Sequence, residues 1–211
     1  MAFLRAYLKF DQNGRGMRRL LLGRRAMLVG LAASIGLITA RAVADDVTVP
    51  VSLQAELVVK VAGYDRNLVV RAEGLVRLLV VSKPDDADSR RVAAQMVNAL
   101  APVADIGGLP KDISTHAYSS AAALAAACRA QRIAIVYLAP GLGDEVPAIA
   151  AALQEQSILS VAAMPSYVPR GIVLGMDVIE GRPKLLLNLT QARKQQVKLR
   201  PDVMQLMKVY P

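Results

Sequence analysis

The sequence is poor in the residues from which metal and redox sites are built. Its 211 residues include one cysteine, one histidine and no tryptophan, and only 4% of them are aromatic. A lone cysteine excludes a disulfide within the chain, and Cys128 with His116 cannot supply the ligands of a Cys/His zinc site. We therefore expect neither a metal nor a cofactor.

Excess positive charge is also scarce outside the N-terminal segment. Residues 1–44 carry eight basic residues and one acidic residue, whereas residues 45–211 carry 18 basic and 16 acidic residues. Most of the net charge of +9 therefore lies ahead of the folded domain. Because a nucleic-acid site requires a basic surface on that domain, we expect no nucleic-acid partner.

The basic segment has the pattern of an export signal. Residues 26–40 (AMLVGLAASIGLITA) form an uncharged apolar run of 15 residues, which is shorter than the roughly 20 that span a membrane. Ala42-Val43-Ala44 then offers small residues for cleavage. The pattern predicts a cleavable secretory signal peptide over residues 1–44, cut after Ala44, and a single exported domain over residues 45–211. A retained membrane anchor is the alternative.

Helical and strand patterns alternate along the exported domain. Residues 51–64 carry apolar side chains at helical spacing, and residues 76–81 (VRLLVV) form a short apolar run typical of a strand buried on both faces. Asp88 or Ser89 can cap the next helix, which presents Val92, Met96 and Leu100 on one side. The alternation continues with strands over residues 113–118, 133–138 and 158–162 and helices over residues 120–131 and 145–156.

Alternating strands and helices predict βαβ units with right-handed crossovers. We therefore expect an α/β fold with an open, mainly parallel sheet flanked by helices, in a Rossmann- or flavodoxin-like three-layer arrangement. Residues 171–179 and 184–188 are joined by only four residues, which predicts an antiparallel hairpin. A short helix over residues 189–195, capped by Asn188 or Thr190, and a terminal helix begun by Pro201 complete the prediction.

The C-terminal part of this pattern resembles a known family. Residues 171–207 contain an apolar strand, the Gly181-Arg182 turn, a second strand that ends in Asn188-Leu189, the pair Ala192-Arg193 and a Leu-rich end. This order resembles the C-terminal signature of the YfiR-like periplasmic family, and the upstream order of elements is similar to that family too. The resemblance therefore covers essentially the whole exported part.

The resemblance implies a periplasmic regulator that is not an enzyme and acts by binding. The best-known members hold a membrane-bound diguanylate cyclase inactive from the periplasmic side, so the implied partner is an inner-membrane signalling protein, a cyclase or kinase. A homodimer is also implied. The chain departs from the family in having only Tyr64-Asp65-Arg66-Asn67 where members often carry an aromatic-rich tract, and in having one cysteine where some members use disulfides.

Two other classes of function remain open. A periplasmic small-molecule binding protein fits the fold class, although about 167 residues are few for a two-lobed receptor. A small hydrolase fits less well, because the sequence contains no Gly-x-Ser-x-Gly elbow. The surroundings of Cys128 indicate a packing residue on an alanine-rich helix, and those of His116 a residue at the surface or at a strand edge.

Candidate binding residues follow from the predicted topology and the charge pattern. Open α/β sheets bind ligands outside the carboxyl ends of their strands, where we place six candidates: Ser82, Lys83, Gly141, Gly143, Ser166 and Tyr167. A basic cluster in the last quarter suits an acidic partner or anionic lipid, and its candidates are Arg182, Lys184, Arg193 and Lys198. Apolar contact surfaces are expected on the first helix at Val58, Val59 and Val61 and on the terminal helix at Met204 and Met207.

Overall fold

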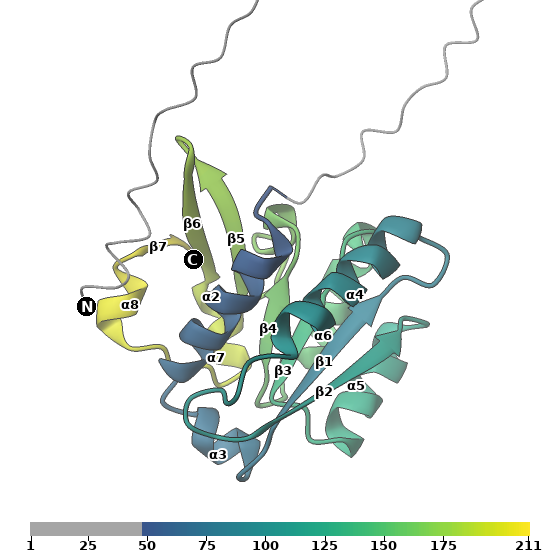
Figure 1. Ribbon diagram of the computed structural model, residues 1–211, viewed down its shortest axis with the longest axis horizontal. Helices are drawn as coiled ribbons and strands as arrows, with labels where there is room; N and C mark the ends of the chain where they lie inside the picture. The colour runs from purple at the N-terminus through teal and green to yellow at the C-terminus, as the bar shows by residue number, and fades with distance from the viewer. Residues whose placement is uncertain (1–47) are drawn as a thin grey trace, which may run out of the picture. The chain divides into compact units, whose positions relative to one another are not determined.

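A computed structural model describes residues 48–211, which form one seven-stranded sheet with helices on both faces (Figure 1). The strands follow the order β2-β1-β3-β4-β5-β6-β7, and every neighbouring pair is parallel except β5 and β6. The predicted signal peptide lies outside the described residues. The strands are β1 Val76–Ser82, β2 Lys111–Ala117, β3 Ile135–Leu138, β4 Leu159–Ala162, β5 Leu174–Ile179, β6 Arg182–Asn188 and β7 Met207–Tyr210.

The helices are placed by the direction in which the chain moves across the sheet. The chain moves one way from β1 to β2 and the opposite way from β2 through β3 to β4, so right-handed crossovers put the first connecting helix on one face and the next two on the other. Accordingly α2 packs with α4, and α5 packs with α6. The helices are α2 Val51–Gly63, α3 Leu68–Ala72, α4 Ala87–Leu100, α5 Ala121–Ala130, α6 Val146–Leu153, α7 Leu189–Lys194 and α8 Pro201–Met204.

The predicted fold class is confirmed. The central strands β3 and β4 are buried at every position, as continuous apolar runs in a covered parallel sheet require. The antiparallel hairpin of β5 and β6 is present, and Asn188 caps α7 by accepting a hydrogen bond from the backbone N–H of Gln191. Pro183 lies in the outer part of β6, beyond the residues that pair with β7, where its missing N–H leaves no gap in that ladder.

Two local predictions are wrong, and one helix was not predicted. The terminal residues do not continue as a helix, because α8 ends at Met204 and Met207–Tyr210 forms β7, which pairs with β6. The cap of α4 is Asp86, whose carboxylate accepts from the N–H of Ser89, rather than Asp88 or Ser89. Helix α3 was not predicted, since five residues are too few to show a helical period.

A buried polar contact fastens α2 to the centre of the sheet. The hydroxyl of Tyr137 in β3 donates to Gln54 Oε1 at 2.9 Å, and Gln54 Nε2 donates to the carbonyls of Val49 and Ala163. Both side chains are fully buried, and burial raises the pKa of Tyr137 far above its ordinary value. The hydroxyl therefore stays protonated and remains the donor of this bond.

A buried ion pair fastens the C-terminal segment to the turn between α2 and α3. Arg71 Nη2 lies 2.6 Å from Asp65 Oδ2, and both side chains are almost completely buried. Asp65 Oδ1 accepts from the backbone N–H groups of Asn67 and Lys198, and Arg71 Nη2 also donates to the carbonyl of Gln196. Burial lowers the pKa of Arg71, and the carboxylate of Asp65 opposes that shift. One ion pair thus joins two helices at the start of the domain to the segment that leads into β7.

Replacing Tyr137 by Phe tests the first of these contacts. We expect Tyr137→Phe to lower the free energy of unfolding by about 1–3 kcal/mol, because Gln54 Oε1 is left buried without a donor. Tyr118→Phe is the matched control, since Tyr118 is only partly buried, and it should change stability by less than about 0.5 kcal/mol. Urea unfolding measures both, and equal effects would contradict the role given to the Tyr137 hydroxyl.

Candidate functional site

The order of the strands places a topological switch point between β1 and β3. Strand β1 has β2 on one side and β3 on the other, so the chain leaves the carboxyl ends of β1 and β3 toward opposite faces of the sheet. Ligands of open α/β sheets bind at such a reversal. The predicted residues Ser82 and Lys83 lie at the end of β1 on one side of this switch point, and Gly141 and Gly143 lie in the loop after β3 on the other.

An ion pair joins the two loops at the switch point. Lys83 Nζ lies 3.0 Å from Glu145 Oε1, and both side chains are partly exposed. The hydrogen bond to Glu145 raises the pKa of Lys83, so the ammonium stays charged. The second carboxylate oxygen of Glu145 is buried and accepts no hydrogen bond from the described residues. A ligand that used Lys83 as its cationic contact would therefore have to displace Glu145.

The glycine loop after β3 is held by both of its neighbours. Gly141 has φ +83°, and a Cβ at this position would lie 2.3 Å from Asp86 Oδ2, so the loop abuts the residue that caps α4. The backbone N–H of Leu142 donates to the hydroxyl of Tyr167 at 2.9 Å. Tyr167 is buried and supports the loop from beneath, whereas the neighbouring Ser166 is exposed. The predicted ligand residues therefore lie in one region, although the hydroxyl of Tyr167 already accepts a hydrogen bond from the glycine loop.

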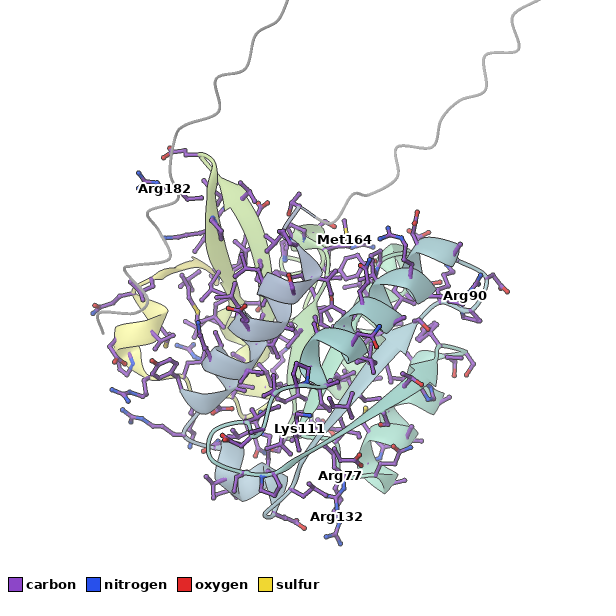
Figure 2. The ribbon with its side chains drawn as sticks, in the orientation of Figure 1. Arg77, Arg90, Lys111, Arg132, Met164 and Arg182 are labelled. Atoms are coloured by element: carbon purple, nitrogen blue, oxygen red, sulfur yellow. The ribbon has the colours of Figure 1, made fainter. Side chains whose placement is uncertain are left out.

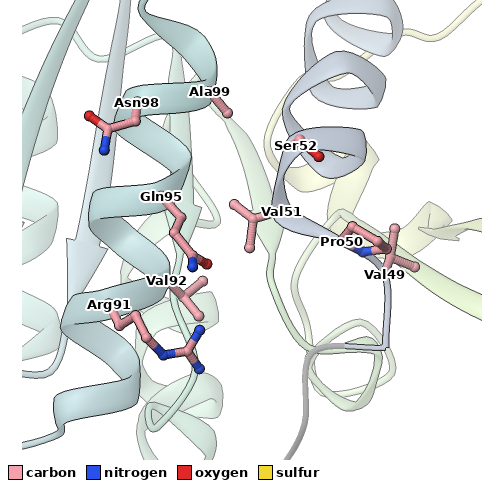
Figure 3. Close-up of a pocket in the computed structure, with 9 residues that line it drawn as sticks. All are labelled: Val49, Pro50, Val51, Ser52, Arg91, Val92, Gln95, Asn98 and Ala99. Carbon is pink, nitrogen blue, oxygen red and sulfur yellow. The ribbon is translucent and has the colours of Figure 1, made fainter.

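A cleft that was not predicted lies between α2 and α4 (Figure 3). Its volume is about 510 Å³, within the range of small-molecule sites. None of the six predicted ligand residues lines it. Apolar and polar side chains both contribute to its lining, which consists of Val49, Pro50, Val51, Ser52, Arg91, Val92, Gln95, Asn98 and Ala99.

The four predicted partner residues fall on two separate surfaces. Arg182 and Lys184 belong to β6, and Figure 2 shows Arg182 at the outer end of the hairpin. Arg193 and Lys198 lie at and beyond the end of α7, which follows the inner end of the same strand. Four strand residues, 185–188, lie between Lys184 and the start of α7, roughly 13 Å along the sheet. The basic residues therefore do not form a single patch.

The prediction of apolar contact surfaces on the first and terminal helices is mostly wrong, because most of the named side chains are buried. Val58, Val61 and Met207 are at most 7% exposed and belong to the core, while Val59 and Met204 are half-buried against it. The strongly exposed apolar side chains lie elsewhere, on α3 at Val69 and Val70. Burial of the helical stripe on α2 follows from its packing against the sheet, which a single sequence cannot distinguish from an outward-facing stripe.

The lone cysteine and histidine have surroundings of different kinds. Cys128 is buried in α5, and burial raises the pKa of its thiol to about 12, so the nucleophilic thiolate is suppressed at neutral pH. His116 lies in the edge strand β2, and its Nε2 is buried without a hydrogen-bond partner among the described residues. Residues 48–211 contain no group of three metal-ligating side chains and no helix long and apolar enough to cross a bilayer.

Comparison with models of known families shows to which family this chain belongs. The model of the YfiR/HmsC-like family matches residues 53–208, which include every helix from α3 onward, most of α2 and the first half of β7. The chain belongs to the YfiR/HmsC-like family. Membership supports, at the level of the family, a periplasmic regulator. None of the curated proteins compared with the sequence matches it.

Solved structures agree with the fold. A conserved domain protein from Vibrio cholerae is similar with a TM-score of 0.54 and 14% identity, over 76% of this chain and 60% of that one. A ligand-free, open substrate binding protein from Clostridium difficile gives 0.49 and 11%, over 68% and 57%. The ABC domain in complex with L-Trp from Streptococcus pneumonia gives 0.49 and 9%, over 71% and 61%. The chain thus spans about 60% of the length of these structures, and the first shows an α/β fold like that of the family member described here.

The tight contact between the glycine loop and the cap of α4 can be tested with two glycines. Gly181→Ala should cost about 1–2 kcal/mol through its positive φ alone, since nothing lies within 4 Å of the added Cβ. Gly141→Ala should cost about 1 kcal/mol more, because the Cβ displaces Asp86 from its capping position. Thermal or urea unfolding of the two variants gives the comparison. Equal costs would mean that Asp86 and the glycine loop are not in contact.

Proposed function

We propose that this family member is a non-enzymatic regulator that binds and restrains the periplasmic part of an inner-membrane signalling protein, a diguanylate cyclase. Membership in the YfiR/HmsC-like family carries the proposal. The predicted export signal supplies the route to the periplasm. A shift in population explains the restraint, because a protein that binds the inactive conformation of its partner more tightly favours that conformation.

The hairpin of β5 and β6 is the surface proposed for the protein partner. Arg182 is exposed and Lys184 partly exposed. Both lie on the strand that follows the turn at Glu180 and Gly181, where positive φ values give a tight reversal. A rigid two-stranded arm with cations near its end can contact an acidic surface without rearrangement of the core. A coupling of about 1–3 kcal/mol between the two proteins would change the population of the active partner by five- to 150-fold.

Two measurements in cells test the proposal, namely crosslinking of the protein and the level of cyclic di-GMP. Deletion of the protein should raise cyclic di-GMP, and the wild-type chain should restore the low level and crosslink to an inner-membrane cyclase. Arg182→Glu with Lys184→Glu should abolish both restoration and crosslinking, because charge reversal at the contact repels an acidic partner.

The matched control reverses two exposed arginines elsewhere on the domain. Arg90→Glu on α4 with Arg129→Glu on α5 changes the charge by the same amount away from the hairpin and outside the lining of the cleft, and should behave as the wild type. A deletion that leaves cyclic di-GMP unchanged would refute the cyclase as the target. Normal crosslinking by the hairpin variant would refute the hairpin as the contact.

The cleft between α2 and α4 supports a second candidate, a small-molecule binding protein. Gln95 and Asn98 offer hydrogen-bonding side chains beside the apolar Val51 and Val92, a mixture that suits a small organic ligand. Native mass spectrometry of the protein purified from its own cells should then reveal a bound compound. An empty protein that gains no thermal stability across a metabolite panel would refute this second function.

A further inference from the structure

The two most exposed large apolar side chains among residues 48–211 are neighbours on α3. Val69 is 61% exposed and Val70 is 77% exposed, while Leu68 and Ala72 of the same helix are buried in the core. The buried side chains fix α3 to the body of the domain. The two valines are therefore held outward on a rigid support rather than on a flexible loop.

Exposed cations lie close to the start of α3. Arg66 lies two residues before Leu68, the first residue of α3, and its backbone N–H donates to the carbonyl of Lys198 at 3.0 Å, so these two exposed residues are neighbours. Asn67 Nδ2 donates to the carbonyl of Gln196 at 2.6 Å, which brings the basic end of α7 close to the same helix.

The carboxylates of this region are already neutralised by other cations. Asp65 is paired with Arg71 in the interior, Glu73 with Arg132 at 2.5 Å, and Asp202 with Arg200 at 3.0 Å. The charge of Arg66 and Lys198 is therefore not cancelled by the acidic residues nearest to them in the chain. The result is a pair of exposed valines beside positive charge that is not compensated.

We propose that this α3 surface, defined by Arg66, Val69, Val70 and Lys198, docks on anionic lipid at a membrane surface. Helix α3 lies at one end of the described domain (Figure 1). Valine side chains can enter the boundary between headgroups and acyl chains while the cations remain among the phosphates. The combination of exposed valines with cations matches an anionic lipid surface, which combines phosphate groups with apolar acyl chains.

Docking by α3 leaves the hairpin pointing away from the lipid. Arg182 lies at the opposite end of the view from Arg132, the partner of Glu73 at the end of α3 (Figure 2). The lipid surface and the surface proposed for the protein partner can thus be used at the same time. The inference goes beyond the proposed function and does not depend on it, because lipid binding requires no protein partner.

A fluorescent label placed at single cysteines tests the docking. In the full chain, Val70→Cys carries an environment-sensitive label such as NBD, and Val178→Cys, 41% exposed on the hairpin, is the matched control. Cys128 stays unlabelled at neutral pH because it is buried and its pKa is about 12. Both chains carry the same N-terminal segment, so a difference between the labels reports where the domain touches the vesicle.

The expected result is a blue shift at position 70 with vesicles of phosphatidylcholine and phosphatidylglycerol, and none at position 178. Vesicles of phosphatidylcholine alone should give little shift at position 70. Arg66→Gln or Lys198→Gln should each weaken binding about five-fold, and added salt should weaken it further. Circular dichroism confirms that each labelled variant is folded.

Three outcomes would overturn the proposal. The absence of a shift at position 70 would mean that α3 does not touch lipid, and an equal shift at both positions would place the contact elsewhere. A shift at position 70 with native inner membranes, but not with protein-free vesicles, would assign the α3 surface to a protein partner instead.

Discussion

A buried ion pair between Asp65 and Arg71 is the constraint on which the C-terminal third of the structure depends. The carboxylate holds the backbone of Lys198, and the guanidinium holds the carbonyl of Gln196, so two residues near the start of the domain fix the segment that leads to β7. Two nitrogens of Arg71 are buried without hydrogen-bond partners among the described residues. The pair is therefore costly to bury, and its benefit lies in fixing one arrangement of the chain.

That arrangement also determines where the surfaces of the molecule lie. With the segment after α7 fixed beside α3, Lys198 is next to Arg66, while Arg182 remains at the far end of β6. The basic residues of the last quarter thus lie at two ends of the sheet and do not form one patch. The loops at the switch point are joined by Lys83 and Glu145, and a cleft lies between α2 and α4. Possible contacts with other molecules are therefore distributed over the surface of a tightly packed core.

The sequence allowed the parallel sheet, the hairpin and the family resemblance to be predicted, because each depends on local patterns. Runs such as residues 76–81 are long enough to show a buried strand, and the turn at Gly181 can join only antiparallel neighbours. Strand β7 could not be recognised, since Val203, Leu206 and Met207 also fit a helical period. Only its pairing with β6 reveals it as a strand.

The sites were harder to predict because they depend on distant residues. The loops after β1 and β3 were expected to hold a ligand, but the ion pair that joins them connects residues 62 positions apart. The buried pair at Asp65 was missed because a charged residue in the short tract after α2 gives no sign of burial. The exposure of Val69 and Val70 was equally hidden, since apolar neighbours in a sequence are ordinarily assigned to the core.

Hydrogen exchange at the backbone N–H of Lys198 is the direct test of whether the buried ion pair fixes the C-terminal segment, because this group donates to Asp65 Oδ1 at 2.9 Å. We predict that this amide exchanges as slowly as the amides of β1, and that Arg71→Leu speeds its exchange while β1 remains protected. Rapid exchange of Lys198 in the wild-type protein, comparable to that of the exposed turn at Glu180, would contradict the claim that the buried ion pair fixes the C-terminal segment.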